Sequence, residues 1–181
     1  MRFPLTVSAV AVLLAACSST SQPRALPVAV PEVVEFAETG TFTAATANLA
    51  SASGSLVSGQ VQLQAEAGAV WVTGEVGGLV PHGSHGLQVH EKGDCSAADA
   101  SSAGPFFDPL EGDNQRGAVT GVPGRIFANE RGVAQVDLRI PGAVLGGGAA
   151  NDISGRALLV LGATPGAFSA RVACGEILAG G

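Results

Sequence analysis

The sequence contains no tyrosine, one tryptophan and three histidines among its 181 residues. Only 13% of its residues are charged, and the formal net charge of −6 leaves no basic surface to neutralise a phosphate backbone. Aromatic residues, at 4%, are too few to build platforms for base stacking. The composition therefore argues against nucleic acid as a partner.

Long hydrophobic runs are also missing, because the apolar stretch 7–14 is far shorter than the roughly 20 residues that span a bilayer. Arg2 precedes this stretch, as in the positively charged start of an export signal. The stretch ends in Ala15-Ala16-Cys17 followed by two serines, which is typical of a bacterial lipobox. We therefore expect residues 1–16 to be a lipoprotein signal peptide and Cys17 to be lipidated. An ordinary signal peptide with an incidental cysteine is the alternative.

Acyl chains on Cys17 would anchor the chain to a membrane, since stable anchoring takes more than one chain. Ser18, rather than aspartate, follows the cysteine, which favours the outer membrane, with the protein facing the periplasm. Residues 17–40 are rich in serine and alanine and contain prolines at 23, 27 and 31, so we interpret them as a tether. Residues 41–181 then form the folded domain, whose protein partner the sequence does not identify.

The remaining two cysteines, Cys95 and Cys174, form an even pair once Cys17 is assigned to lipid. Export places them in an oxidising compartment, where a disulfide is the default expectation.

Short runs in which apolar residues alternate with polar ones dominate this domain, and Gly, Pro, Asn or Asp bound them. The runs lie at 57–64, 70–76, 87–90, 133–138, 157–161 and 170–173. No segment keeps a helical period, so the pattern predicts an all-β antiparallel sandwich or barrel. One irregular stretch, about 93–124, interrupts the pattern. A loop of that length is usually functional or tied down, and Cys95 lies near its start.

Four segments resemble motifs of the copper/zinc superoxide dismutase family. They occur in the family's order and contain both cysteines. The segments are HGLQVHEKGDCS (85–96), SAGPFFDP (102–109), GRALLVL (155–161) and RVACG (171–175). The resemblance covers about residues 41–178 and implies an eight-stranded Greek-key β-barrel. It also implies a Cys95–Cys174 disulfide.

The family holds copper with four histidines and zinc with three histidines and an aspartate, one histidine being shared. Here Gln88 stands at the first copper position, His90 is kept at the second, Phe106 stands at the bridging position and Leu161 at the last. Of the four imidazoles that bind copper in the family, only that of His90 is kept here, and a redox-active copper ion needs several imidazole ligands.

The zinc positions are similarly depleted, with Ala118 at a histidine position and Gly121 at the aspartate position. The paired site needs six histidines, whereas the chain contains His82, His85 and His90. His85 matches a structural histidine of the family, and His82 lies in a Pro-Gly turn. We therefore assign no catalytic, cofactor-binding or metal-binding residue and expect no cofactor.

Phe106 and Leu161 are expected to fill the former metal pocket with apolar side chains. Arg171 matches the arginine that attracts the anion in the family, and without copper we expect it to hold the disulfide loop instead. The sequence thus predicts a catalytically inactive, superoxide dismutase-like envelope lipoprotein with a structural or binding role. A dismutase with an unorthodox metal site, or a carrier of a small ligand or metal, is the alternative.

Overall fold

The computed structural model describes residues 35–112, 124–162 and 169–180, all within one compact unit, Val33–Gly181. They form eight β-strands and one short 3₁₀ helix, η1 (Ser101–Ala103). The strands are β1 (Ala44–Ser51), β2 (Ser58–Glu66), β3 (Ala69–Gly77), β4 (Ser84–His90), β5 (Gly124–Phe127), β6 (Ala134–Pro141), β7 (Ala157–Leu161) and β8 (Arg171–Ala179). Among the described residues, no helix is long and apolar enough to cross a membrane.

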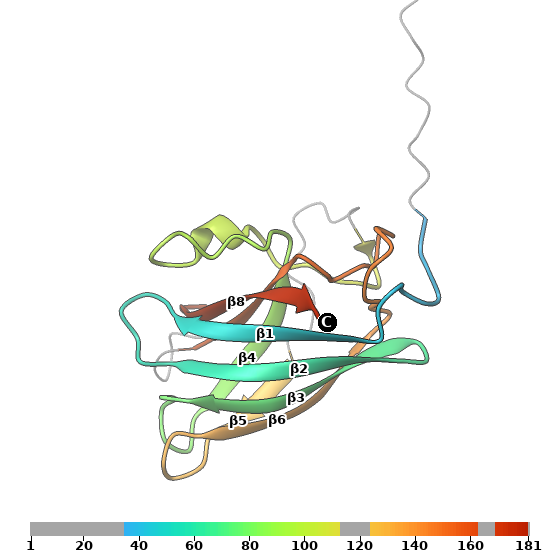
Figure 1. The fold of residues 1–181 in the computed structure, drawn as a ribbon. Helices are drawn as coiled ribbons and strands as arrows, with labels where there is room; N and C mark the ends of the chain where they lie inside the picture. Colours follow the sequence, from blue (N-terminus) through green and yellow to red (C-terminus); the bar gives the residue numbers. More distant parts are fainter. Residues whose placement is uncertain (1–34, 113–123, 163–168, 181) are drawn as a thin grey trace, which may run out of the picture. The chain divides into compact units, whose positions relative to one another are not determined.

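All strand pairs are antiparallel, and the spatial order is β5-β4-β7-β8-β1-β2-β3-β6. The first and last strands of this order, β5 and β6, also lie close together, so the sheet curls into a nearly closed barrel (Figure 1). Neighbours such as β3–β6 and β4–β7 are not consecutive in the chain, as Greek-key connections require. The predicted fold class is confirmed.

The core of the barrel is formed by every second residue of the alternating runs. Val61 and Leu63 of β2 are fully buried, and their neighbours on either side are exposed or half-buried. Val70 and Val72 of β3 follow the same pattern. Because side chains on a strand alternate between two faces, this period of two assigns one face to the core and the other to solvent.

Two strands, β1 and β5, were not among the six alternating runs. The inward residues of β1 include Ala45 and Ala47, which are small and weak strand formers, so its alternation is faint. Strand β5 has four residues and buries one of them, Ile126. It begins at Gly124, where the predicted irregular stretch ends.

Candidate functional site

Three of the four positions that correspond to the family's copper ligands, Gln88, His90 and Leu161, lie on β4 and β7, and Phe106 follows η1. Leu87 and Val89 of β4 point into the barrel core, so Gln88 and His90 face the opposite side. Gln88 is paired with Leu159 of β7 across the sheet. This outer face is covered by the loop that follows β4.

His90 is the one imidazole on this face, and it is 4% exposed. Its Nδ1 lies 2.8 Å from the carbonyl oxygen of Gly104, and since a carbonyl only accepts, Nδ1 carries the hydrogen. Nε2 is buried without a hydrogen-bond partner among the described residues. Burial lowers the pKa of His90, and the nearby positive charge of Arg171 lowers it further, whereas the hydrogen bond to Gly104 opposes the shift. The side chain is therefore held as a neutral imidazole.

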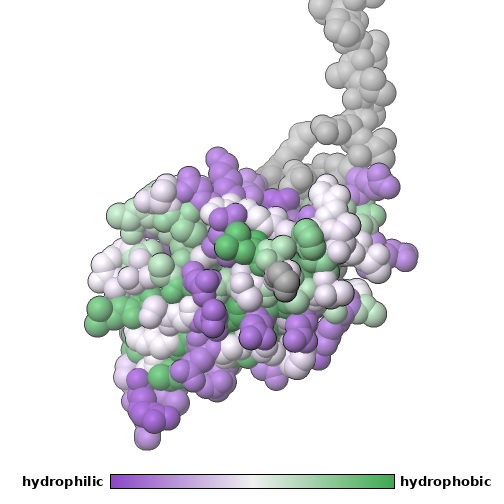
Figure 2. Space-filling model, viewed as in Figure 1, coloured by the Kyte–Doolittle hydropathy of each residue, from purple (hydrophilic) through white to green (hydrophobic). Residues whose placement is uncertain are grey.

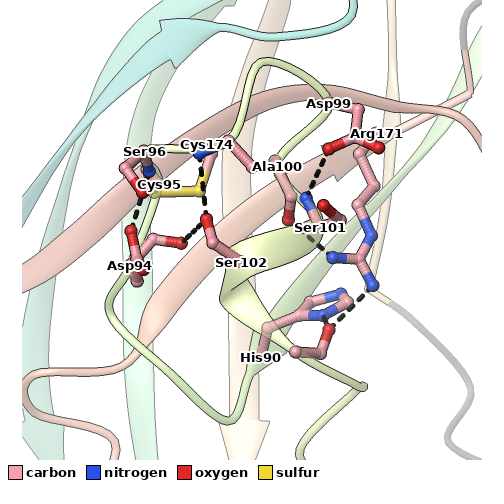
Figure 3. Close-up of a disulfide and its surroundings, with 12 residues drawn as sticks. His90, Asp94, Cys95, Ser96, Asp99, Ala100, Ser101, Ser102, Arg171 and Cys174 are labelled. Atoms are coloured by element: carbon pink, nitrogen blue, oxygen red, sulfur yellow. Dashed lines mark hydrogen bonds between the residues drawn. A yellow bond between two sulfur atoms is a disulfide. The ribbon is translucent and has the colours of Figure 1, made fainter.

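Arg171, at the start of β8, uses its guanidinium to hold the loop after β4. Nη1 donates to the carbonyl oxygen of Ala100 at 2.6 Å and Nη2 to that of Gly104 at 2.7 Å (Figure 3). Ala100 has a left-handed backbone conformation (φ 55°), so this carbonyl belongs to a tight turn. Arg171 thus links β8 to two backbone carbonyls of this loop.

The same loop is shaped by two carboxylates that accept hydrogen bonds from backbone amides two residues ahead. Asp94 accepts from Ser96 at 2.8 Å, and Asp99 accepts from Ser101 at 3.0 Å (Figure 3). Hydrogen bonding by the side chains of Ser96 and Ser101, and then by their backbone amides, lowers the pKa of the exposed carboxyl groups of Asp94 and Asp99. The loop is thus ordered by its own turns as well as by Arg171.

A disulfide joins Cys95 of this loop to Cys174 of β8, with Cα atoms 5.7 Å apart (Figure 3). The predicted pairing is confirmed. Around it lies a second apolar cluster, outside the barrel core, which we call the outer core. Its buried members are Ala52, Ala100, Ala103, Ala157, Leu159, Leu161 and Cys174, with Cys95 packed against them.

Leu161 belongs to this outer core and is 9% exposed, so the last copper position is occupied by an apolar side chain within a packed cluster. Phe106 behaves differently from the expectation. It forms an isolated bridge with His90 but is only partly buried and belongs to neither apolar cluster. Its neighbour Phe107 is 1% exposed in the barrel core instead, since adjacent residues of an extended segment point to opposite sides.

The three histidines do not converge on one site. His85 lies on β4 with the same parity as the core residues, so it faces away from His90. It is 4% exposed, and neither ring nitrogen has a partner among the described residues. His82 is exposed in the turn before β4. Within residues 35–112, 124–162 and 169–180, no three His, Cys, Asp or Glu side chains are placed to share a metal ion. Ala118 and Gly121 lie outside these ranges.

A cavity of about 260 Å³ opens beside β4 and β6. Its walls are mostly aliphatic and aromatic, including Leu87, Phe107 and Leu138, and its polar lining residues are Gln88, Asp108 and Arg139. His90 is not part of its lining. The cavity is therefore lined mainly by barrel residues and offers no imidazole to a ligand.

Leu159 is the site residue that the sequence argument did not single out. It lies two positions before Leu161, so both side chains point to the outer core. All five residues of β7 are buried, which distinguishes this strand from the half-exposed runs of the chain. Residues 157–161, which were predicted as an alternating run, are apolar throughout, and such a continuous apolar run indicates a strand that is covered on both faces.

The family model for copper/zinc superoxide dismutase (SODC) matches residues 57–177. The matched region extends from just before β2 into β8 and contains both cysteines, His90 and Leu161.

Proposed function

The chain belongs to the copper/zinc superoxide dismutase family, and we propose that it is a non-catalytic member with a structural or binding role in the cell envelope. Fold membership alone does not confer an activity, so the proposal depends on the residues at the site.

The observation that carries the proposal is the outer core around Leu161. A copper ion needs several donor atoms arranged around an open position. Here Leu161, at the position that matches the family's last copper ligand, belongs to the same buried apolar cluster as Leu159, Ala100 and Ala103. A well-packed apolar cluster offers neither ligands nor room for an ion with its coordination shell.

The remaining polar groups do not fit a paired copper and zinc site. His90 offers a single free nitrogen, Nε2, because Nδ1 is bound to Gly104. Gln88 offers a neutral amide in place of an imidazole, and His85 lies on the other face of β4. One imidazole and one amide are too few to hold a redox-active copper ion.

The location in the envelope rests on the N-terminal residues, which lie outside the described ranges. The lipobox at Cys17 and the tether that follows it support a lipid-anchored protein facing the periplasm of a bacterium. The family-type disulfide supports folding in an oxidising compartment.

The decisive experiment loads the purified full chain with copper and zinc and measures both bound metal and superoxide removal, with a metal-replete family member as the positive control. We expect less than one equivalent of either metal and no removal of superoxide above the buffer rate. Catalytic removal would overturn the proposal in favour of an unorthodox dismutase. Stoichiometric metal without activity would favour a metal carrier.

A further inference from the structure

The cavity beside β4 and β6 is lined by two residues at positions that match copper ligands of the family, Gln88 and Phe106. Val72 and Leu158, which also line it, are fully buried members of the barrel core. Purple and white side chains cover most of the surface in front of β1, β2 and β3, with smaller green patches between them (Figure 2), whereas aliphatic and aromatic residues dominate the lining of the cavity. The cavity is therefore an apolar site that extends from the former copper positions to the barrel core.

The cavity lies where the edge of β4 opposite β7 changes its partner. Strand β5 covers this edge as far as Leu87, which is paired with Gly124, the first residue of β5. Further along β4, the backbone amide of Phe107 donates to the carbonyl oxygen of Val89 at 2.9 Å. Gln88 lies between these two contacts, and its side-chain amide has no hydrogen-bond partner among the described residues. A half-buried and unengaged amide is thus part of the wall of an apolar cavity.

The two charged residues of the lining, Arg139 and Asp108, are opposite in sign and already engaged. Arg139 forms a salt bridge with Glu66 at 2.9 Å, and Asp108 accepts a hydrogen bond from the backbone amide of Leu110 at 3.0 Å. A charged ligand would lose its hydration in an apolar cavity whose own two charges cancel. The lining therefore favours a neutral ligand, to which the amide of Gln88 can both donate and accept a hydrogen bond.

The volume of the cavity limits the size of this ligand. It is about 260 Å³, whereas an apolar protein cavity of about 150 Å³ holds one benzene molecule. The cavity thus has room for two fused rings, and it is smaller than the roughly 300–1,000 Å³ of sites for drug-sized ligands. Phe106 and Phe107 both contribute to the lining, and aromatic rings pack favourably against one another in offset or edge-to-face arrangements. Size and lining together favour a small aromatic molecule.

We propose that this cavity binds a neutral aromatic molecule of up to two fused rings, with one hydroxyl or similar group that hydrogen-bonds to Gln88. Burial of the rings against Val72, Leu138 and Leu158 would supply the binding free energy, because apolar surface is removed from water. The hydrogen bond to Gln88 would satisfy the single polar group of the ligand. Such a ligand would give the non-catalytic family member its binding role, so the proposal rests on the proposed function.

The test is calorimetric titration of the metal-free full chain, carrying Cys17→Ser so that it is not lipidated, with 2-naphthol. We expect saturable binding of one molecule per chain and changes in the methyl NMR signals of Val72, Leu138 and Leu158. The comparison molecules are 2-naphthoate, which carries a charge on the same rings, and 1-nonanol, which has its hydroxyl on a flexible chain. Each should bind at least about tenfold more weakly. Absence of saturable 2-naphthol binding, or equally tight binding of either comparison molecule, would overturn the proposal.

Gln88→Leu tests the polar contact separately from the apolar cavity. The substitution nearly keeps the size of the side chain but removes its amide, so the affinity for 2-naphthol should fall about fivefold, as expected for one net hydrogen bond. The affinity for naphthalene, which has no group that donates or accepts, should not fall. An unchanged affinity for 2-naphthol, or an equal fall for both ligands, would contradict the contact with Gln88.

Two substitutions that fill the cavity show whether the ligand enters it. Leu138→Phe and Ile140→Phe enlarge half-buried lining residues of β6, and each should weaken 2-naphthol binding at least about tenfold. Leu178→Phe is the control, because Leu178 of β8 is 49% exposed and does not line the cavity, so this variant should bind as the parent does. Circular dichroism identifies the variants that fold. Parent-like binding by a folded filling variant would overturn the proposal.

These titrations are independent of the metal-loading experiment, since they use neither copper nor superoxide. Their failure would leave the non-catalytic assignment standing. Catalytic removal of superoxide by the metal-loaded chain would, in turn, overturn that assignment and leave the titration result unchanged.

Discussion

His90 and Arg171 donate hydrogen bonds to the same acceptor, the carbonyl oxygen of Gly104, from 2.8 Å and 2.7 Å. Gly104 directly follows η1, so a β4 side chain and a β8 side chain meet on the loop that contains Cys95. A neutral His90 satisfies this arrangement. A protonated His90 would add a second positive charge beside Arg171 and a buried N–H at Nε2 without an acceptor among the described residues.

Acid should therefore destabilise the fold through His90. Its pKa is lowered from 6.5 in the folded state, chiefly by burial, so the unfolded chain takes up the proton first as the pH falls. The free energy of unfolding should decline from about pH 7 downward, by at most about 1.4 kcal/mol per pH unit, until the folded pKa is passed. Urea unfolding of His90→Gln between pH 7 and 5 should show a flatter profile than the parent.

The control for this measurement is His82→Gln, which changes an exposed histidine and should keep the parent slope. The carboxyl groups of Asp94 and Asp99 do not account for a slope between pH 7 and 5. Their pKa values are lowered from 3.8, so their contribution to stability is present above that pH and is lost only below it. An unchanged slope in His90→Gln would contradict the role given to His90.

Truncation of Leu161 should show how much the outer core contributes to the free energy of unfolding. Leu161→Ala removes buried methyl groups from a packed cluster and should reduce the free energy of unfolding by roughly 2–4 kcal/mol. Leu161→Met, which nearly conserves volume, should cost less than about 1.5 kcal/mol. Leu178→Ala is the matched control, because Leu178 is 49% exposed and should contribute less than about 1 kcal/mol. Equal losses in Leu161→Ala and Leu178→Ala would argue against a packed outer core.

Arg171→Lys should loosen the disulfide loop without unfolding the barrel. Lysine keeps the charge but lacks the planar fork that reaches both Ala100 and Gly104, so at least one carbonyl loses its donor. We expect a loss of about 1–3 kcal/mol and faster hydrogen exchange at the amides of residues 100–104. Arg131→Lys, on an exposed turn, should leave that exchange unchanged. If the amides of residues 100–104 exchanged as slowly in Arg171→Lys as in the parent, the proposal that Arg171 holds this loop would be wrong.

The disulfide should contribute more to stability than any metal. It closes a loop with a sequence separation of 79 residues, for which chain entropy gives about 4–4.5 kcal/mol as an upper figure. Reduction, or Cys95→Ser/Cys174→Ser, should lower the melting temperature by roughly 10 °C or more. A strong chelator should leave the melting temperature unchanged. Two free thiols in the exported protein, or equal effects of chelation and reduction, would contradict this prediction.

Membrane association should depend on Cys17. Cys17→Ser blocks lipid attachment and should move the protein from the membrane fraction to the soluble fraction, while mass spectrometry of the parent should show that residues 1–16 are absent. Fractionation of Cys17→Ser with membranes, as for the parent, would show that the lipobox interpretation is wrong.

The barrel and the disulfide could be predicted from the sequence because their signals are local. Alternation assigns Val61 and Leu63 to the core, and the family motifs contain both cysteines. Residue type could not predict which of Phe106 and Phe107 enters the barrel core, since the two residues are both apolar and adjacent. The bridge between Phe106 and His90 fixes the parity that sends Phe107 inward. That choice depends on tertiary register rather than on residue type.

The outer core was predicted only in part for a related reason. Leu161 was expected to fill a former metal pocket, but its partners Leu159 and Ala103 come from distant segments that only the folded chain brings together. For small residues such as Ala103, the sequence gives little indication of whether the side chain is buried. Their packing becomes visible when the loop after β4 closes over β7.

The packing of Leu161 also bears on whether such a chain can regain a metal ion by stepwise change. Leu161→His alone would place a polar ring in an apolar cluster, where it lacks partners and lowers stability. It would bind copper weakly, because Gln88 and Phe106 supply no imidazole to share the ion. Leu161→His made first therefore lowers stability without creating a copper site, so the order in which these positions change would matter.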